Sequence, residues 1–198
     1  MLNNALREYQ IILGSGSPRR QAYLREMGID FEVRTKSIPE NYPHHLKGAE
    51  ISEFLAQLKA RAFMDGLREK DILITSDTVV WHRETSLAKP ENREEAIAML
   101  CTLSGDSHDV ITSICITQKK VQRTVTETTQ VRFKALDIAE IEYYVDRYKP
   151  YDKAGGYGIQ EWIGLIGITQ IRGSYANVVG LPTHLLYKTL MQVAGDGV

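Results

Sequence analysis

The stretch Gln10-Ile11-Ile12-Leu13-Gly14-Ser15-Gly16-Ser17-Pro18-Arg19-Arg20 combines an apolar run, a small flexible segment and a helix start. The apolar run at 11–13 predicts a short buried strand. The residues at 14–17 end this strand, and Pro18 stands at the first helical position, which proline favours. Ser17 is then the N-cap of the helix. The stretch therefore predicts a strand, a tight turn and a helix in direct succession.

The turn within this stretch is a candidate anion site. Backbone N–H groups at the N-terminus of a helix, together with the helix dipole, favour a phosphate there. Arg19 and Arg20 follow at once, and a guanidinium offers paired donors that match phosphate oxygens. The pattern is not a Walker loop, because no Gly-Lys-Ser/Thr follows, and not a Rossmann fingerprint, because Arg19 replaces the third glycine. The alternative interpretation is a surface loop with two solvated arginines.

The remainder of the chain alternates helical and extended patterns. Apolar residues spaced for one face predict a helix over 51–62, and Asn92 with Glu95, like Asp137 with Glu140, has the form of a capping box. We expect strands at 72–75, 110–117, 121–133 and 165–171, the second and third of them antiparallel, and helices that begin at Asn92, Asp137 and Pro182. This mixture predicts an α/β or α+β fold in which helices flank a mixed sheet.

Composition is that of an ordinary soluble globular protein. The chain has 198 residues, of which 43% are hydrophobic and 25% charged, and its net charge is -1. This length fits one domain over 1–198 or two closely packed lobes. Balanced charge predicts no long-range attraction to nucleic acid or to an anionic membrane, so we expect neither as a partner.

The cellular compartment of the protein is predicted from the spacing of its cysteines and from the length of its apolar runs. Cys101 and Cys115 lack a C-x-x-C spacing, and we interpret both as reduced core thiols. Residues 1–10 are too polar for a signal peptide, and no apolar run approaches the roughly 20 residues that cross a bilayer. The expected location is the cytoplasm.

Two carboxylates are candidate metal ligands. Asp77 follows the predicted strand at 72–75, at the edge of an α/β sheet where ligands usually bind, and Glu40 lies on an earlier loop. Mg²⁺ and Mn²⁺ take carboxylate oxygens together with substrate phosphates, so this pair fits a site beside a phosphate-binding turn. Taken singly, Asp77 is equally well explained as a cap and Glu40 as an exposed loop acid.

Lysines and a glycine-rich loop complete the candidate residues. Lys59 flanks the apolar stripe of its helix and Lys89 precedes Pro90; either alone is explained as a solvated lysine. The loop at 152–160 holds three glycines beside a charged pair, which indicates either a demanding turn or a close approach of backbone to a ligand. The histidines show no spacing typical of a metal site, and we interpret them as surface or capping residues.

These segments together resemble the Maf family. The family motifs match Ser15-Gly-Ser-Pro-Arg-Arg20, Ser76-Asp-Thr-Val-Val80, Lys89-Pro90, Leu103-Ser-Gly-Asp-Ser-His108, Asp152-Lys-Ala-Gly-Gly-Tyr-Gly-Ile-Gln160 and Asn177-Val-Val-Gly-Leu-Pro182. Each motif alone is weak, but six in this order along nearly the whole chain are specific. The chain departs from the family pattern at 37–42, at Gly156, where alanine is commoner, and at Glu161-Trp162, which replace a glycine-led stretch.

The resemblance implies a nucleoside triphosphate pyrophosphatase, with a two-lobed fold similar to that of inosine triphosphate pyrophosphatases and often a homodimer. It implies a general base at Asp77, a divalent cation, Mg²⁺ or Mn²⁺, held by Asp77 and Glu40, and the other active-site residues Ser15, Arg19, Arg20, Lys59, Lys89 and Gln160. Arg19, Thr78 and Gln160 match the positions that separate the substrate classes of the family.

The base of the substrate is predicted from Gln160. A side-chain amide complements the N3–H donor and O4 acceptor of uracil or thymine, so dTTP and UTP are the expected substrates, in a house-cleaning role for the nucleotide pool. Within the enzyme class, the alternative is hydrolysis of a modified guanine triphosphate of the 7-methyl-GTP type. The alternatives from other classes are a non-catalytic regulator of cell division (septum formation) and a nucleic acid binding module, which the low aromatic content of 8% disfavours.

Overall fold

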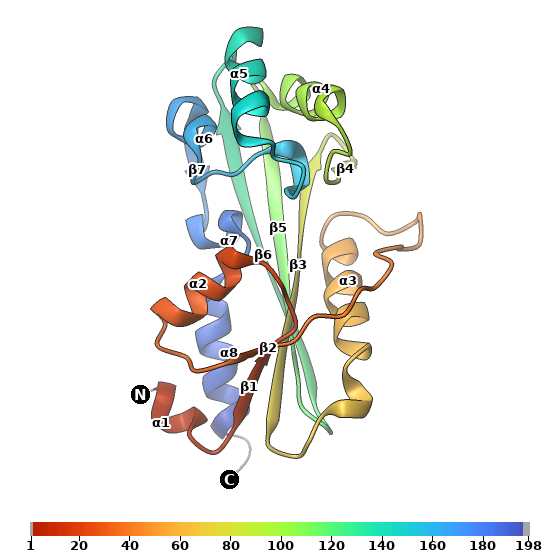
Figure 1. The fold of residues 1–198 in the computed structure, drawn as a ribbon, viewed down its shortest axis with the longest axis vertical. Coiled ribbons are helices and arrows are strands. Elements are labelled where there is room, and N and C mark those ends of the chain that lie inside the picture. The colour runs from red at the N-terminus through yellow and green to blue at the C-terminus, as the bar shows by residue number, and fades with distance from the viewer. Residues whose placement is uncertain (1, 196–198) are drawn as a thin grey trace.

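A computed structural model describes residues 2–195, which form one seven-stranded sheet with helices around it (Figure 1). The strands are β1 (Gln10–Leu13), β2 (Glu32–Val33), β3 (Asp71–His82), β4 (Thr85–Leu87), β5 (Ser107–Thr117), β6 (Gln122–Phe133) and β7 (Ile168–Arg172). Their order is β2-β1-β3-β5-β6-β7, with β4 also paired to β3. β1 is parallel to β2 and β3, and all other pairs are antiparallel. The mixed sheet is therefore confirmed, as is the antiparallel pairing of β5 with β6.

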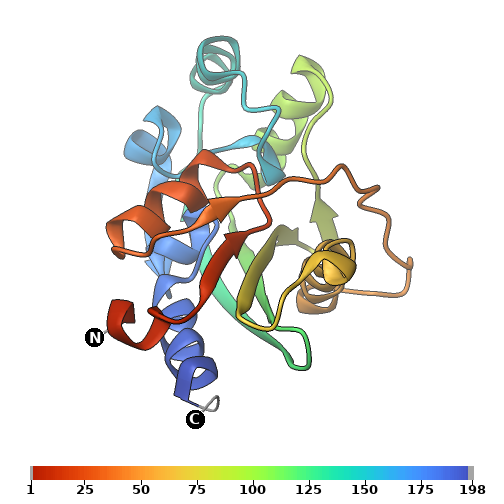
Figure 2. The ribbon, with the colours of Figure 1, turned by 60° about the horizontal axis from the view of Figure 1, so that its bottom comes forward.

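Helices cover both faces of the sheet, which confirms the α/β class with flanking helices. The helices are α1 (Leu2–Leu6), α2 (Pro18–Glu26), α3 (Ala49–Arg61), α4 (Arg93–Leu103), α5 (Ile138–Tyr148), α6 (Trp162–Gly167), α7 (Tyr175–Val179) and α8 (Thr183–Gly195). At one end of the sheet α3 lies on one side, with α1, α2 and α8 on the other, whereas α4, α5 and α6 gather at the opposite end (Figures 1 and 2). Between residues 2 and 195, no helix is both long enough and apolar enough to cross a membrane.

The first part of the core follows from the period-two alternation of the strands. Ile11 and Ile72 point to the face covered by α1, α2 and α8, whereas Ile12 and Leu73 point to α3. Both sets are almost fully buried. A parallel strand pair buried on both faces requires such continuous apolar runs, because neither face meets water.

A second core cluster lies at the opposite end of the same strands. Val80 of β3, Val110 of β5 and Phe133 of β6 pack there against α4, α5 and α6, which contribute among others the fully buried Leu100 and Tyr144. β3, β5 and β6 thus run continuously through both clusters. The space between the clusters is where the candidate site lies.

Local capping signals were accurate. The side chain of Ser17 accepts a hydrogen bond from the Arg20 backbone N–H, and Asn92 accepts from Glu95, so both N-caps are confirmed. Asp137 and Glu140 form the expected capping box of α5.

Other local predictions were wrong. Residues 162–167 form a helix, so β7 is shorter than the strand expected at 165–171, and α1, β2 and α7 were missed. Cys101 is exposed on α4 rather than part of the core, because it lies on the outer face of that helix; Cys115 is buried. His82 and His108 are buried, not surface residues, because β3 and β5 are covered on both sides where they stand.

Candidate active site

The site opens at a gap in the pairing along one edge of β3. On this edge β1 pairs with residues 71–74 of β3 and β4 pairs with residues 80–82, while β5 occupies the other edge over 73–81. Within the described sheet, residues 75–79 have no strand partner on the β1 side. Asp77 lies in this gap. Its predicted place at the end of a strand is wrong, because β5 continues to pair with β3 beyond it.

A cleft of about 760 Å³ occupies the gap, a volume within the range of small-molecule sites. The turn at 14–17 borders it and approaches β3 so closely that a Cβ on Gly14 would lie 2.7 Å from Cγ2 of Thr75. Residues predicted for the site from sequence all line the cleft: Ser15, Arg19, Arg20, Glu40, Lys59, Asp77, Thr78, Lys89 and Gln160. The fold therefore brings together groups that lie far apart in the sequence.

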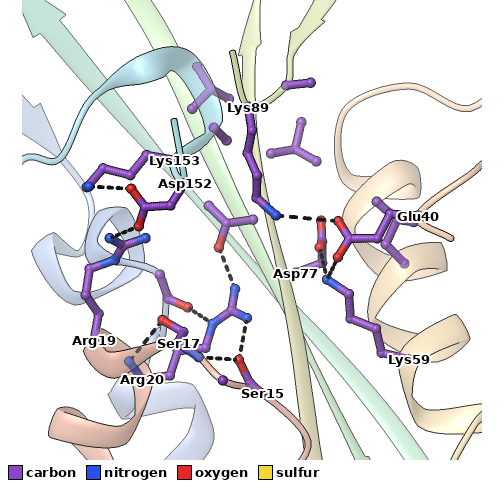
Figure 3. A pocket seen from close by; sticks show the side chains of 18 of the residues that line it. Ser15, Ser17, Arg19, Arg20, Glu40, Lys59, Asp77, Lys89, Asp152 and Lys153 are labelled. Atoms are coloured by element: carbon purple, nitrogen blue, oxygen red, sulfur yellow. Dashed lines mark hydrogen bonds and ion pairs between the residues drawn. The ribbon is translucent and has the colours of Figure 1, made fainter. Parts of the chain in front are cut away.

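One side of the cleft holds an alternating cluster of charges (Figure 3). The ammonium group of Lys59, from α3, lies 2.6 Å from Oδ1 of Asp77 and 3.0 Å from Oε1 of Glu40. Lys89, which follows β4, lies 3.8 Å from Oε2 of Glu40. The side chain of Asp77 is 9% exposed and that of Lys89 55%, so the cluster extends from the floor of the cleft to its rim.

The charges around Glu40 hold its carboxylate in the ionised form. Burial by itself would raise the pKa of Glu40, but the attraction and hydrogen bond of Lys59, with help from Lys89 and Arg20, outweigh it and hold that pKa below its usual value. Oδ1 of Asp77 accepts from Lys59, whereas Oδ2 has no hydrogen bond to any residue in 2–195. A free carboxylate oxygen thus faces the cleft.

A divalent cation fits this donor set when phosphates complete it. Asp77 and Glu40 both contact the ammonium group of Lys59, so the two carboxylates lie close enough together to contact one cation. Within residues 2–195, no group of three or more histidine, cysteine or acidic side chains could hold a metal by itself. Mg²⁺ favours a ligand set of one or two carboxylate oxygens together with phosphate oxygens of the substrate.

The guanidinium of Arg20 is hydrogen-bonded to residues at the floor of the cleft. Its guanidinium donates to the backbone carbonyls of Ser76 and Gly180, both at 2.9 Å, and to the hydroxyls of Ser15 at 3.3 Å and Thr78 at 3.2 Å. The Ser76 carbonyl lies in the gap of β3, where a neighbouring strand would otherwise donate. Arg20 therefore replaces a strand partner and fixes two hydroxyls that line the cleft.

Arg19 takes a different position. It reaches across the cleft to Asp152, with 3.3 Å between Nη1 and Oδ2, and is 29% exposed. Asp152 in turn lies 2.6 Å from the ammonium group of the buried Lys153 (Figure 3). One ion pair thus links α2, just after the turn at 14–17, to the glycine-rich loop at 152–160.

Gln160 lies on the loop that follows Lys153 and is exposed to the cleft. Its amide makes no hydrogen bond to any residue from 2 to 195, so it is available to a ligand. Thr78 does not hold it, because the Thr78 hydroxyl is shared with Thr112 at 2.9 Å and with Arg20. The loop itself is held from beneath, where the Tyr157 hydroxyl lies 2.7 Å from Nε2 of His108.

The roles of several of these supporting residues could not be predicted from the sequence. In the sequence Asp152 and Lys153 stand out only as a charged pair, and His108 lies within a family motif but is predicted as a surface or capping residue. Tyr144 and Glu161, which also hold the loop, carried no signal beyond the departure from the family pattern at Glu161. Their roles depend on contacts between α5 and the loop, which no spacing in the sequence encodes.

His108 makes stability depend on pH. Burial, with a smaller effect of the nearby His82, lowers the pKa of His108 from 6.5 to about 4, against the attraction of Asp106. In the unfolded chain His108 takes up a proton as pH falls below 6.5, whereas in the folded chain it does so only near pH 4. The contribution of His108 to the free energy of unfolding is therefore complete above pH 6.5 and is lost as the pH falls toward 4. We expect a loss of about 3 kcal/mol across this window.

Urea denaturation at pH 7 and pH 4.5 checks this expectation, with His108→Gln as the matched variant, since glutamine can still bond to Tyr157 but does not titrate. The wild-type protein should lose about 2 kcal/mol more than the variant between the two pH values. Equal losses would show that His108 does not contribute.

The fold and the cleft define an α/β protein with a charged cleft whose volume fits a small molecule. The chain belongs to the family described as Maf-like protein, which matches residues 10–193. The family expected from the sequence motifs is thereby confirmed.

Relatives of similar length carry one name. The chain is 50% identical over 193 residues to a protein of Christiangramia forsetii named dTTP/UTP pyrophosphatase, covering 98% of each chain. It is 48% identical over 194 residues to a Bacteroides fragilis protein of the same name, covering 98% of this chain and 100% of the relative. Among solved structures, it is similar to the Staphylococcus aureus Ham1 protein (TM-score 0.47, 14% identity, 63% of this chain and 71% of that one). A second similar structure is a nucleoside-triphosphatase, dITP/XTP pyrophosphatase, from Mycobacterium abscessus (TM-score 0.43, 12% identity, 96% and 97%).

Proposed function

We propose that the protein hydrolyses dTTP and UTP to the monophosphate and pyrophosphate, which would remove these nucleotides from the pool. The observation that carries this proposal is the cleft itself, in which a phosphate-binding turn with Arg19 and the Asp77–Lys59–Glu40 cluster line one cavity (Figure 3). The names of relatives at about half identity support the same substrates.

The proposed reaction is an attack of water on the α-phosphorus. Oδ2 of Asp77 accepts the proton of the water, a P–O bond forms, and the bond from the α-phosphorus to the bridging oxygen breaks to release pyrophosphate. Lys59 lies beside Asp77 and Lys89 beside Glu40, and both neutralise the charge that builds on the phosphates. Arg19 binds phosphate after exchanging its partner Asp152, whereas Arg20 positions Ser15 and Thr78.

A bound Mg²⁺ or Mn²⁺ is part of this proposal. Asp77 and Glu40 are the residues that would hold it, together with phosphate oxygens of the substrate. Such an ion supplies electrostatic stabilisation of the phosphates.

Release of pyrophosphate is the assay that tests the proposal. A panel of UTP, dTTP, CTP, GTP and 7-methyl-GTP, each with Mg²⁺, with Mn²⁺ or with a chelator, should give the highest kcat/KM for UTP and dTTP. Pyrophosphate rather than single phosphate should appear. A preference for 7-methyl-GTP would overturn the substrate assignment, and no turnover of any member would favour the non-catalytic regulator.

Gln160→Glu should depress hydrolysis of UTP and dTTP by about ten- to a hundredfold. The carboxylate lacks the donor that pairs with O4 of the base, so a polar group stays unpaired in the complex. Gln170→Glu, on the exposed strand β7 and outside the cleft, is the matched control and should retain wild-type kcat/KM. If both variants keep full activity, Gln160 does not recognise the base.

A further inference from the structure

Glu161 directly follows Gln160 and its carboxylate is held from two sides. Oε1 lies 3.1 Å from the ammonium group of Lys153, and Oε2 accepts a hydrogen bond from the Tyr144 hydroxyl. The same Tyr144 oxygen accepts a hydrogen bond of 3.0 Å from the backbone N–H of Gly158. The side chain of Glu161 is 19% exposed and that of Lys153 is 9% exposed, and Tyr144 is fully buried. The carboxylate is therefore fixed in place.

The Tyr144 hydroxyl keeps its proton in this arrangement. Burial, with the hydrogen bond and negative charge of Glu161, raises the pKa of Tyr144 far above its usual value. Lys153 also contacts Asp152, so Glu161, Lys153, Asp152 and Arg19 form a continuous series of charges toward the phosphate-binding turn. The loop is thus tied at Glu161 to α5 and, through that series, to the turn.

Gly158 brings this carboxylate next to the amide of Gln160. A Cβ built on Gly158 would lie 2.9 Å from Nε2 of Gln160 and 3.0 Å from Oε2 of Glu161. The amide and the carboxylate therefore lie against the same glycine, and a Cβ at this position would displace one or both of them. The amide end that lies on this side is the NH₂ group.

Electrostatics favour this orientation of the amide. A carboxylate attracts the NH₂ end of a neighbouring amide and repels its carbonyl end, and the effect is strong where water is partly excluded. The Gln160 amide makes no hydrogen bond to any residue between 2 and 195, so no such bond opposes this orientation. Glu161 thus leaves Oε1 of Gln160 free to face the base.

We propose that Glu161 is the positioning residue that orients the Gln160 amide and so makes the cleft prefer uracil and thymine over cytosine. This inference rests on the proposed function. The N3–H of uracil or thymine donates to Oε1. Cytosine has an acceptor at N3, so it would require the amide to turn over and place its carbonyl against the Glu161 carboxylate.

Glu161→Gln tests the inference, because it removes the charge and keeps the shape. We expect the ratio of kcat/KM for UTP to that for CTP to fall about tenfold, through a higher KM for UTP and a lower one for CTP, with kcat little changed. Glu142→Gln is the matched control, since this α5 carboxylate pairs with Arg93 away from the cleft and its loss should leave the ratio unchanged. Binding of UMP and CMP, measured by calorimetry, should show the same change in ratio without turnover.

Other results would overturn the inference. A folded Glu161→Gln protein with an unchanged ratio, or with equal losses for UTP and CTP, would show that Glu161 only supports the loop. If this variant does not fold, Tyr144→Phe, which removes one hydrogen bond from the carboxylate, should lower the ratio, and an unchanged ratio there would count equally against it. Failure of the proposed function would give a different result from failure of this inference. The wild-type enzyme would then prefer a guanine nucleotide or release no pyrophosphate. The binding of UMP and CMP would still test the role of Glu161.

Discussion

Asp77→Asn should fold normally and lose most of its pyrophosphatase activity, on the order of 10²- to 10⁴-fold in kcat. Asparagine keeps the oxygen that accepts from Lys59, so the ion pair of Lys59 with Glu40 and the pairing of β3 stay in place. What disappears is the carboxylate oxygen Oδ2, which in the proposed reaction accepts the proton of water. The lost negative charge also weakens the proposed metal site.

Steady-state kinetics with UTP, together with thermal denaturation, check this expectation. Asp109→Asn is the matched control, because Asp109 is a half-buried carboxylate on the neighbouring strand β5 and does not line the cleft. The control should retain near wild-type turnover. Substantial turnover by a well-folded Asp77→Asn protein would remove Asp77 from the mechanism.

Arg20→Ala should lower the free energy of unfolding by about 3 kcal/mol, whereas Arg19→Ala should change it by less than about 1 kcal/mol. Removing Arg20 leaves the buried carbonyls of Ser76 and Gly180 without their donor. Removing Arg19 breaks only a partly exposed ion pair with Asp152. For a chain of this size the difference corresponds to roughly 5 to 10 °C in Tm.

Thermal and urea denaturation without nucleotide measure the difference between these adjacent arginines. Both variants should also bind UTP more weakly, Arg19→Ala through a lost phosphate contact and Arg20→Ala through displaced Ser15 and Thr78. Equal stability of the two variants would show that the carbonyls find other donors and that Arg20 is free for phosphate.

Much of the fold could be predicted because its signals are local. The strand at 10–13, the caps at Ser17 and Asn92 and the β5–β6 hairpin each depend on residues close together in the sequence. The full length of β3 could not be predicted, since it depends on β5 and β4, which pair with it from later in the chain. The helix at 162–167 was missed because an apolar run containing two glycines resembles a strand.

The candidate site was predicted as a set of residues but not as a set of contacts. The motifs identified the groups that line the cleft, yet nothing in two adjacent arginines tells which one donates to backbone carbonyls and which reaches Asp152. That distinction depends on the end of β1 at Leu13 and on the position of Gly180, whose carbonyl accepts a hydrogen bond from Arg20. The homodimer, the metal ion and the cytoplasmic location stay predictions.

The three long strands also determine how the cleft can move. Within residues 2–195, β3, β5 and β6 each pass without interruption from one core cluster to the other, so three continuous strands join the two ends of the sheet (Figure 1). A hinge changes the backbone of a few linker residues, but rotation of one end here would bend or break the hydrogen bonds of a continuous ladder. We therefore expect this enzyme to be mechanically stiff along the sheet, with substrate entry and product release governed by the segments at 34–48 and 150–161 at the rim.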